Sequence, residues 1–284
     1  MLDYDPAVPL DLREIRIEER DGARIQDVTF ASPGGAVSAY IVEPTPVVST
    51  HAPATGPNRA GIVFFHWLEY GAPTSNRTEF LPDAVTLAGH AGRGGADGNG
   101  VVSVLIQGAF PWTDPPADLA HDRAAVVAEV LKVRRTIDLL LARGDVDPGR
   151  IAVVGHDYGA MYAILLAGVD PRPVAFVLMA ATPRHADWNI PFWLESAGLD
   201  DAGQAAYRAG MAPLDPISAV GSAAPASLLF QFARTDFYIP ESTALSFYAA
   251  ASEPKRLELF DAEHPLNDEA TTSRLVWLRG QLGV

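Results

Sequence analysis

The sequence contains no cysteine among its 284 residues. This absence excludes disulfide bonds, thiolate metal sites and cysteine nucleophiles. Basic residues are also scarce, because 21 lysines and arginines face 35 aspartates and glutamates and the formal net charge is −14. An acidic surface repels phosphate backbones and anionic lipids, so neither nucleic acid nor a membrane surface is an expected partner.

Long apolar runs are missing as well. No stretch approaches the roughly 18 consecutive apolar residues that indicate a membrane-spanning helix. The first 22 residues, MLDYDPAVPLDLREIRIEERDG, carry acids where a secretory signal peptide carries bases, and no apolar run follows them. We therefore expect a cytoplasmic protein.

The remaining composition is that of an ordinary globular protein, with 48% hydrophobic and 20% charged residues. A chain of this length lies near the upper limit for one hydrophobic core, so we expect a single domain over residues 1–284. Whether it forms a homodimer stays open at this level.

Apolar runs of strand length alternate with helical patterns along most of the chain. Such alternation predicts an α/β fold, with a mostly parallel central sheet and helices on both faces. A short helical lid is expected at about 184–223, between two of the strands. The expected strands are 27–31, 36–44, 61–66, 101–108, 151–155, 174–181, 226–233 and 256–261, and the expected helices are 79–91, 122–144, 160–168, 242–251 and 267–283.

The most informative segment is Gly155-His156-Asp157-Tyr158-Gly159, which fits the pattern Gly-x-nucleophile-x-Gly. A buried strand precedes it and a helix rich in small residues follows. The two glycines leave room for a strained turn that projects the central side chain at the carboxyl end of the sheet. The central residue is an aspartate, where a hydrolase usually has serine.

An elbow nucleophile needs a base, and the base needs an acid to orient it. Asp236 follows the expected strand 226–233, and His264 follows the expected strand 256–261. The chain order nucleophile, acid, histidine is the order of this kind of elbow. The alternatives are that Asp236 caps the next helix and that His264 is an ordinary loop histidine.

These residues resemble the α/β-hydrolase fold. The segments GHDYGAMYA, LDPISAV, APASLLFQFARTDFYIP, EPKRLELFDAEHPLND and RLVWLRGQL are similar to bacterial members of the dienelactone hydrolase and prolyl oligopeptidase-like group. The resemblance covers most of residues 25–284. Asp157 departs from it, because most of that group has serine there. An aspartate at this position is typical of haloalkane dehalogenases, epoxide hydrolases and fluoroacetate dehalogenases.

The aspartate bears on the reaction class. A carboxylate attacks an ester carbonyl poorly, because the adduct expels carboxylate more readily than alkoxide. Displacing a halide or opening an epoxide instead gives a stable alkyl ester of Asp157, which water activated by His264 and Asp236 would hydrolyse. The first hypothesis is therefore a cofactor-free hydrolase acting on an epoxide or alkyl halide.

Two alternatives stay open. In the first alternative, the protein is an esterase-like or lactonase-like enzyme or a lyase, and Asp157 acts as a base or an anchor. In the second alternative, the protein is a non-catalytic relative that binds a small molecule. Whether the enzyme is the hydrolase of the first hypothesis or the esterase-like alternative, the backbone N–H of Tyr158 is one expected oxyanion donor. The backbone N–H of Trp67 or Leu68 is the other. Two carboxylates facing His264 should also raise its pKa.

Several further side chains are candidates to contact a small-molecule substrate. A tyrosine O–H suits an epoxide oxygen, an indole N–H suits a halide, and the sequence does not choose between them. The candidates are His66, which we expect mainly to brace its loop, and Tyr70, Trp112, Trp188, Trp193 and Tyr207, each of which packing alone would also explain. His51, His90 and His121 show no metal-binding spacing, so no metal and no cofactor are expected.

Overall fold

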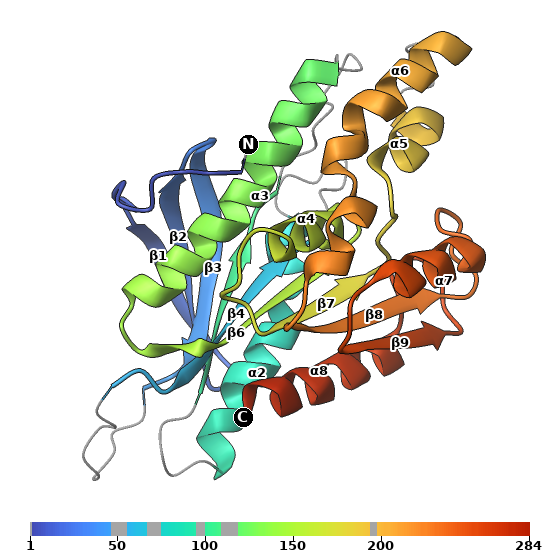
Figure 1. The fold of residues 1–284 in the computed structure, drawn as a ribbon. Coiled ribbons are helices and arrows are strands. Elements are labelled where there is room, and N and C mark those ends of the chain that lie inside the picture. Colours follow the sequence, from blue (N-terminus) through green and yellow to red (C-terminus); the bar gives the residue numbers. More distant parts are fainter. Residues whose placement is uncertain (1, 47–55, 67–74, 95–99, 109–118, 194–197) are drawn as a thin grey trace.

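A computed structural model describes residues 2–46, 56–66, 75–94, 100–108, 119–193 and 198–284 (Figure 1). For residues 75–76, 90–94 and 193 only the backbone is described. The α/β architecture expected from the sequence is confirmed. Among the described residues, no helix combines the length and the apolar character that crossing a membrane would require.

Among the described residues, nine strands form one sheet in the order β1-β2-β3-β5-β4-β6-β7-β8-β9. The pairs β1-β2, β2-β3 and β3-β5 are antiparallel. The remaining neighbours in the sheet, from β5 through β4, β6, β7 and β8 to β9, are parallel. The strands are β1 (Arg13–Arg20), β2 (Ala23–Ser32), β3 (Gly35–Pro44), β4 (Arg59–Phe65), β5 (Val101–Ile106), β6 (Val146–His156), β7 (Ala175–Met179), β8 (Ser227–Ala233) and β9 (Lys255–Phe260).

Helices connect the parallel strands and also fill the segment between β7 and β8, where a lid was expected. In that segment η1 is a π-helix, whereas η3, η4 and η5 are short 3-10 helices. The helices are α1 (Ser75–Thr78), α2 (Leu81–Gly94), α3 (Leu119–Ala142), α4 (Tyr158–Ala167), α5 (His185–Trp188), η1 (Asn189–Trp193), α6 (Asp201–Met211), η3 (Ala212–Leu214), η4 (Pro216–Ser218), η5 (Val220–Ser222), α7 (Glu241–Ala250) and α8 (Asp268–Leu282).

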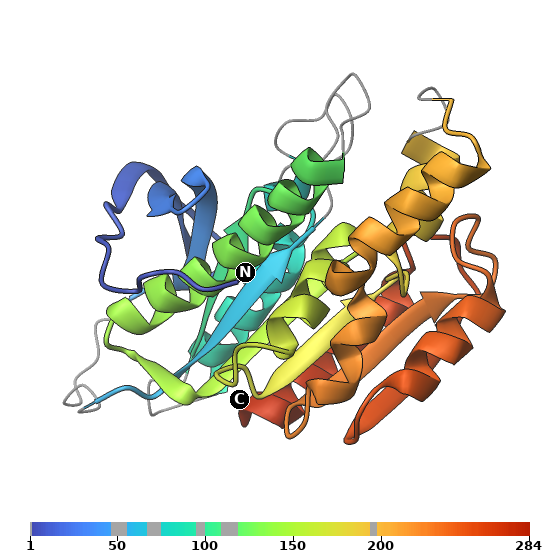
Figure 2. The ribbon, with the colours of Figure 1, turned by 45° about the horizontal axis from the view of Figure 1, so that its top comes forward.

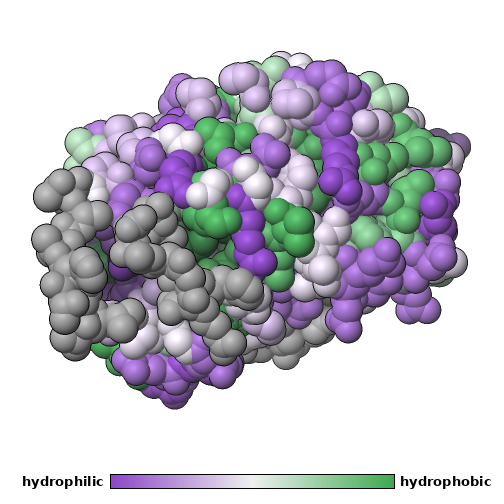
Figure 3. Space-filling model, turned by 90° about the horizontal axis from the view of Figure 1, so that it is seen from below, coloured by the Kyte–Doolittle hydropathy of each residue, from purple (hydrophilic) through white to green (hydrophobic). Residues whose placement is uncertain are grey.

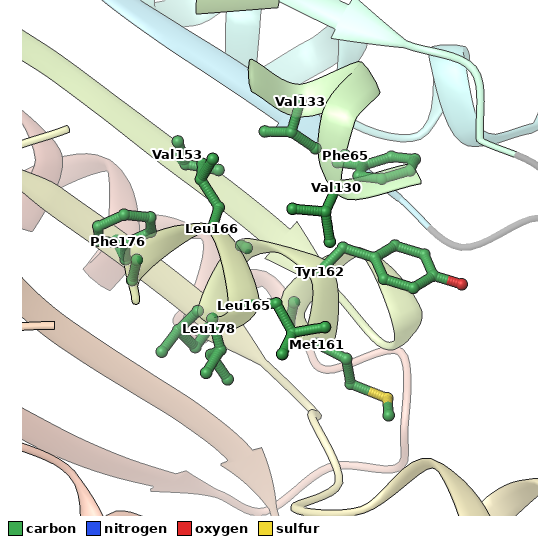
Figure 4. Close-up of a cluster of buried hydrophobic side chains, with 14 of the residues drawn as sticks. Phe65, Val130, Val133, Val153, Met161, Tyr162, Leu165, Leu166, Phe176 and Leu178 are labelled. Atoms are coloured by element: carbon green, nitrogen blue, oxygen red, sulfur yellow. The ribbon is translucent and has the colours of Figure 1, made fainter. Parts of the chain in front are cut away.

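The sheet separates two hydrophobic cores, because successive strand residues point to opposite faces. Helices α3, α4 and α7 cover one face, and α2 and α8 cover the other (Figure 2). In β6, for example, Val153 belongs to the first core and Val154 to the second. Helix α4 packs into the first core against the sheet and beside α3. The side chains of this core labelled in Figure 4 are Phe65, Val130, Val133, Val153, Met161, Tyr162, Leu165, Leu166, Phe176 and Leu178.

The outer surfaces of these layers are mixed in character. In α8, Leu275, Leu278 and Leu282 are buried, whereas Val276 is exposed to solvent. Figure 3 shows hydrophilic and hydrophobic residues side by side on the face seen from below in Figure 1. This is the pattern expected where helices bury one side against a sheet and present the other to water.

One strand of the described sheet, β1, was not expected from the sequence. Strand β1 (REIRIEER) pairs antiparallel with β2 at the edge of the sheet, and all but one of its residues are exposed. Because both of its faces meet water, it lacks the alternation of apolar and polar residues that marks a half-buried strand. Charged side chains on an exposed edge strand also discourage pairing with another chain.

The strand order identifies one point in the sheet at which the direction of winding reverses. The chain runs from β4 outward to β5, then crosses back over β4 to β6, so β4 and β6 flank the point where the winding direction reverses. Ligand sites of open α/β sheets lie at the carboxyl ends of strands at such a point. His66 follows β4 directly, and Asp157 follows β6.

The turn from β6 into α4 depends on its two glycines. A Cβ added to Gly159 would lie 2.0 Å from the carbonyl oxygen of Phe65 at the end of β4. A Cβ added to Gly155 would lie 2.5 Å from backbone atoms of Gly159 and Ala160. Both contacts are far inside van der Waals distance, and backbone atoms cannot move aside cheaply. Close approach of α4 to β4 and β6 therefore requires glycine at both positions.

We expect Gly159→Ala to lower the free energy of unfolding by more than about 3 kcal/mol, because the new methyl group overlaps the Phe65 carbonyl. Gly280→Ala is the matched control, since a Cβ there meets no atom within 4 Å and the residue lies in α8. It should stabilise the protein by up to about 1 kcal/mol. Urea unfolding measures both, and a change below about 0.5 kcal/mol for Gly159→Ala, the range of ordinary surface substitutions, would contradict the close approach.

Candidate active site

Asp157 occupies the turn between β6 and α4 with φ 57° and ψ −125°. A positive φ is costly for a residue with a side chain, and it persists only where the surrounding structure fixes it. Here the backbone N–H of Asp157 donates to the carbonyl of Met179, and its carbonyl accepts from Ala160 and Met161. The side chain is nearly buried, with 7% of the residue exposed.

The two carboxylate oxygens of Asp157 have different partners. Oδ1 accepts the backbone N–H of Tyr158 at 2.5 Å. Oδ2 lies 3.3 Å from Nε2 of His264. One oxygen therefore sits at the helix N-terminus, where an N–H group and the helix dipole stabilise negative charge, and the other faces the imidazole.

Asp236 contacts the opposite side of the same imidazole. Its Oδ2 lies 2.8 Å from Nδ1 of His264, and its Oδ1 accepts the backbone N–H groups of Tyr238 and Ile239 at 2.8 and 3.1 Å. Asp236 does not cap the following helix, since the residue at the N-cap of α7 is Pro240. The structure thus brings Asp157, Asp236 and His264 together from the ends of three parallel strands.

The imidazole between two carboxylates is strongly perturbed. Burial opposes its charge, but hydrogen bonds and electrostatic attraction from Asp157 and Asp236 raise the pKa of His264 to about 9. The sequence-based expectation of a raised pKa is confirmed. At pH 7 the ring is therefore charged, and both of its N–H groups donate, one to each carboxylate. Burial raises the pKa of the Asp157 carboxyl, against the lowering effect of His264 and of the Tyr158 N–H.

A second histidine fixes the backbone of the first. Burial and the neighbouring His66 and His264 hold the pKa of His156 well below its usual range, so its ring is neutral. Its Nε2 lies 3.1 Å from the carbonyl oxygen of His264 and must donate to it, since a carbonyl only accepts. Nδ1 of His156 then accepts from Nε2 of His66 at 2.9 Å. His66 and His156 together join the end of β4 and the elbow to the His264 loop.

A buried polar chain connects the elbow to the lid segment. The Tyr158 hydroxyl donates to Asn189 Oδ1 at 2.9 Å, and Asn189 Nδ2 donates to the Tyr207 oxygen at 2.8 Å. The Tyr207 hydroxyl donates in turn to Asp122 Oδ2 at 2.7 Å. Trp188 packs edge-on against His264, and its indole N–H donates to the carbonyl of Tyr238 at 3.4 Å.

These contacts locate two of the expected substrate-contacting residues. The hydroxyl of Tyr207 and the indole N–H of Trp188 are both engaged within the protein in this structure. Their roles toward a leaving group stay predictions. Trp193 lies in η1, and its side chain is not described. Four other candidates lie outside the described residues: Trp67, Leu68, Tyr70 and Trp112.

Four residues near the site were not identified from the sequence as site residues. His156 holds the carbonyl of His264, Tyr238 lies beside the His264 ring, and Asn189 and Asp122 continue the hydrogen-bonded chain from Tyr158. A signal existed for two of them. His156 stands inside the elbow pattern, and Tyr238 follows Asp236 by two residues.

Comparisons with solved structures agree with this fold. An acetyl xylan esterase from a Paenibacillus species has a TM-score of 0.73 at 18% identity, over 96% of this chain and 89% of that one. An acetyl xylan esterase from a Thermoanaerobacterium species has a TM-score of 0.71 at 14% identity, over 98% and 90%. A 2,6-dihydroxy-pseudo-oxynicotine hydrolase has a TM-score of 0.61 at 16% identity, over 89% and 67%. At these identities the likeness shows the fold alone.

A search of curated proteins by sequence finds no match. A family model does match residues 35–279, which include the elbow, both strand-end residues and the lid segment. This match covers most of the chain and agrees with the observed strand order, the strained turn at residue 157 and the facing imidazole. The chain therefore belongs to the alpha/beta hydrolase family.

Proposed function

We propose that the protein is a cofactor-free hydrolase in which Asp157 attacks a saturated carbon of an epoxide or alkyl halide. The observation that carries this proposal is that the two carboxylate oxygens of Asp157 have different partners. Oδ1 is held by the Tyr158 N–H, while Oδ2 faces His264 and is the oxygen that would attack. A serine has one side-chain oxygen and could not fill both positions.

In the first step, Oδ2 of Asp157 forms a bond to the substrate carbon, and the carbon–halogen or carbon–oxygen bond breaks. The bonding electrons leave with the halide or with the epoxide oxygen, which takes a proton from water. An alkyl ester of Asp157 results. Its carbonyl oxygen is Oδ1, which already accepts the Tyr158 N–H. The second step therefore begins with one oxyanion donor in place.

The second step needs a base, and ester formation supplies one. Alkylated Asp157 carries no charge, so His264 loses one of the two carboxylates that raise its pKa. The ring then releases its proton to solvent more readily and can accept one from water. Asp236 keeps Nδ1 oriented while the hydroxide attacks the ester carbonyl. Cleavage of the carbonyl–Oδ2 bond expels an alkoxide, which takes the proton from His264 and leaves as the alcohol. The new Asp157 carboxylic acid returns a proton to His264, which restores the carboxylate.

Ester hydrolysis is the second candidate, because two of the similar solved structures are acetyl xylan esterases. In that reaction Asp157 would act as a base or an anchor rather than as the nucleophile. Two features weigh against it. The Tyr158 N–H, which would stabilise a substrate oxyanion, is occupied by Asp157 itself, and His264 is already protonated at neutral pH. We therefore rank alkyl transfer first.

Replacing His264 by glutamine tests the nucleophile. Alkylation needs only the Asp157 carboxylate, whereas hydrolysis of the ester needs a base. With a true substrate, His264→Gln should accumulate a stoichiometric covalent ester, seen by intact-mass spectrometry as the mass of the whole epoxide or of the alkyl group without halogen. Peptide mapping should place it on the peptide that contains GHDYGAMY.

The control for this trap is the double variant that also carries Asp157→Asn, which should stay unmodified. An adduct on Asp236 would contradict the assignment. So would the absence of any adduct on a substrate that the wild-type enzyme turns over.

The pKa of His264 should depend on Asp157. Carbon-13 NMR titration of labelled histidine should give about 9 for His264 in the wild-type protein. Asp157→Asn removes a carboxylate that stabilises the imidazolium, so the pKa should fall toward the ordinary value near 6.5. Since the folded value of His264 is raised, the stability that its protonation contributes should be fully present below about pH 6.5, as long as the carboxylates stay ionised, and lost as pH rises through about 9. An unchanged pKa in Asp157→Asn would mean that the two groups are uncoupled.

Asp157→Ser tests the reaction class. It places a hydroxyl where His264 can take its proton, and it frees the Tyr158 N–H for a substrate oxyanion. Hydrolysis of p-nitrophenyl acetate should rise roughly 100-fold over wild type, the low end of what a positioned general base contributes. Alkylation by epoxides and halides should disappear. If the wild type already hydrolyses aryl esters and the serine variant is no faster, the second candidate replaces the first.

A further inference from the structure

Three aromatic side chains gather at the solvent edge of the site, and we call them the aromatic mouth: Phe192 of η1, and Phe237 and Tyr238 after β8. They are exposed by 36%, 79% and 42%. Their ring centroids lie 5.2 to 6.1 Å apart, and the two contacts made by Tyr238 are edge-to-face. The three rings thus contact one another and stay exposed to water, and contiguous exposed apolar surface of this kind is typical of binding sites.

The aromatic mouth is continuous with the reacting groups. The Tyr238 ring packs edge-on against the His264 ring, with 5.0 Å between centroids. Trp188, which is buried, also packs edge-on against both rings, at 6.1 Å from Tyr238 and 5.7 Å from His264. A path of aromatic surface therefore leads from solvent at Phe237 to the imidazole beside Asp157.

The exposure of Phe237 is built into the turn that carries it. Asp236 accepts the backbone N–H groups of Tyr238 and Ile239 with one oxygen and holds His264 with the other. The carboxylate that orients the imidazole therefore also fixes the backbone on both sides of the two rings. This turn ties the backbone that carries the rings to the carboxylate that holds the imidazole.

The charge of the site limits what can follow this path. Two carboxylates and one imidazolium leave one negative charge in excess, on a chain with a net charge of −14. An anionic substrate would approach Asp157 against this potential. An aromatic ring without charge meets no such barrier, and its edge and face complement the exposed rings.

We propose that the site takes a neutral substrate with an aromatic ring close to the reacting carbon, and that this ring lies on Phe192, Phe237 and Tyr238. The identity of the reacting centre rests on the function proposed above, whereas the aromatic mouth does not. A second copy of the chain is the rival occupant of this surface, so the test must separate the two.

The test uses three unreactive probes of similar size: phenylacetamide, cyclohexylacetamide and phenylacetate. Binding is followed at the His264 ring signals by NMR with carbon-13-labelled histidine, assigned by comparison with His264→Gln, so that only binding near the site is counted. Phenylacetamide should bind wild type about fivefold more tightly than cyclohexylacetamide, the size expected of an added aromatic pair. Phenylacetate should bind more weakly than the amide, because Asp157 repels it.

Two variants and a control locate the effect. Phe237→Ala should remove the preference for the aromatic amide, and Phe237→Leu should remove it as well, since it keeps apolar area without a ring. Val276→Ala, which also shortens an exposed apolar side chain but on α8, should leave all three affinities unchanged. Circular dichroism would confirm that the variants fold.

Equal affinities for the two amides, or an aromatic preference that survives in Phe237→Ala, would overturn the proposal. So would a dimer, seen by sedimentation, that Phe237→Ala dissociates, because the surface would then belong to a second copy. Failure of the reaction is distinguishable from these results. If the aromatic preference is found but His264→Gln traps no epoxide or halide, the aromatic mouth stands and the alkyl-transfer chemistry fails.

Discussion

The site depends on one electrostatic arrangement, a charged imidazole held between two nearly buried carboxylates. Charges removed from water are costly unless they are paired and hydrogen-bonded. Here each one is: Asp157 accepts the Tyr158 N–H, Asp236 accepts two backbone N–H groups, and both N–H groups of His264 point to carboxylates. Removing one member leaves another unpaired, so the three side chains hold one another in place.

The sheet supplies the distances that this arrangement requires. Parallel strands lie about 5 Å apart, and their carboxyl ends meet at one edge, so residues that follow β6, β8 and β9 converge there. The elbow brings Asp157 above the helix only because α4 can approach β4 at Gly159. The protein thus tolerates a positive φ at Asp157 in exchange for a carboxylate with one oxygen on the helix N-terminus and one toward His264.

Local patterns made the elbow, the two strand-end residues and the parallel strands predictable, because each has its own sequence signature. Contacts between residues far apart in the sequence have no such signature and could not be predicted. The acceptor of His156 is a backbone carbonyl 108 residues away, and any residue there would supply one. Tyr207 lies in an amphipathic helix whose spacing explains it without Asp122, 85 residues distant. Strand β1 was not predicted because both of its faces meet water, so its sequence lacks the alternation of apolar and polar residues.

The hydrogen bonds from Tyr158 through Asn189 and Tyr207 all donate in one direction, toward the carboxylate of Asp122. Asn189 and Tyr207 belong to the segment between β7 and β8, whereas Tyr158 and Asp122 belong to the helices beneath it. Lifting that segment would therefore break the first and last of these bonds and expose their buried partners. Opening would therefore be a cooperative transition. It would directly affect Tyr158, whose hydroxyl begins this chain and whose backbone N–H is the oxyanion donor.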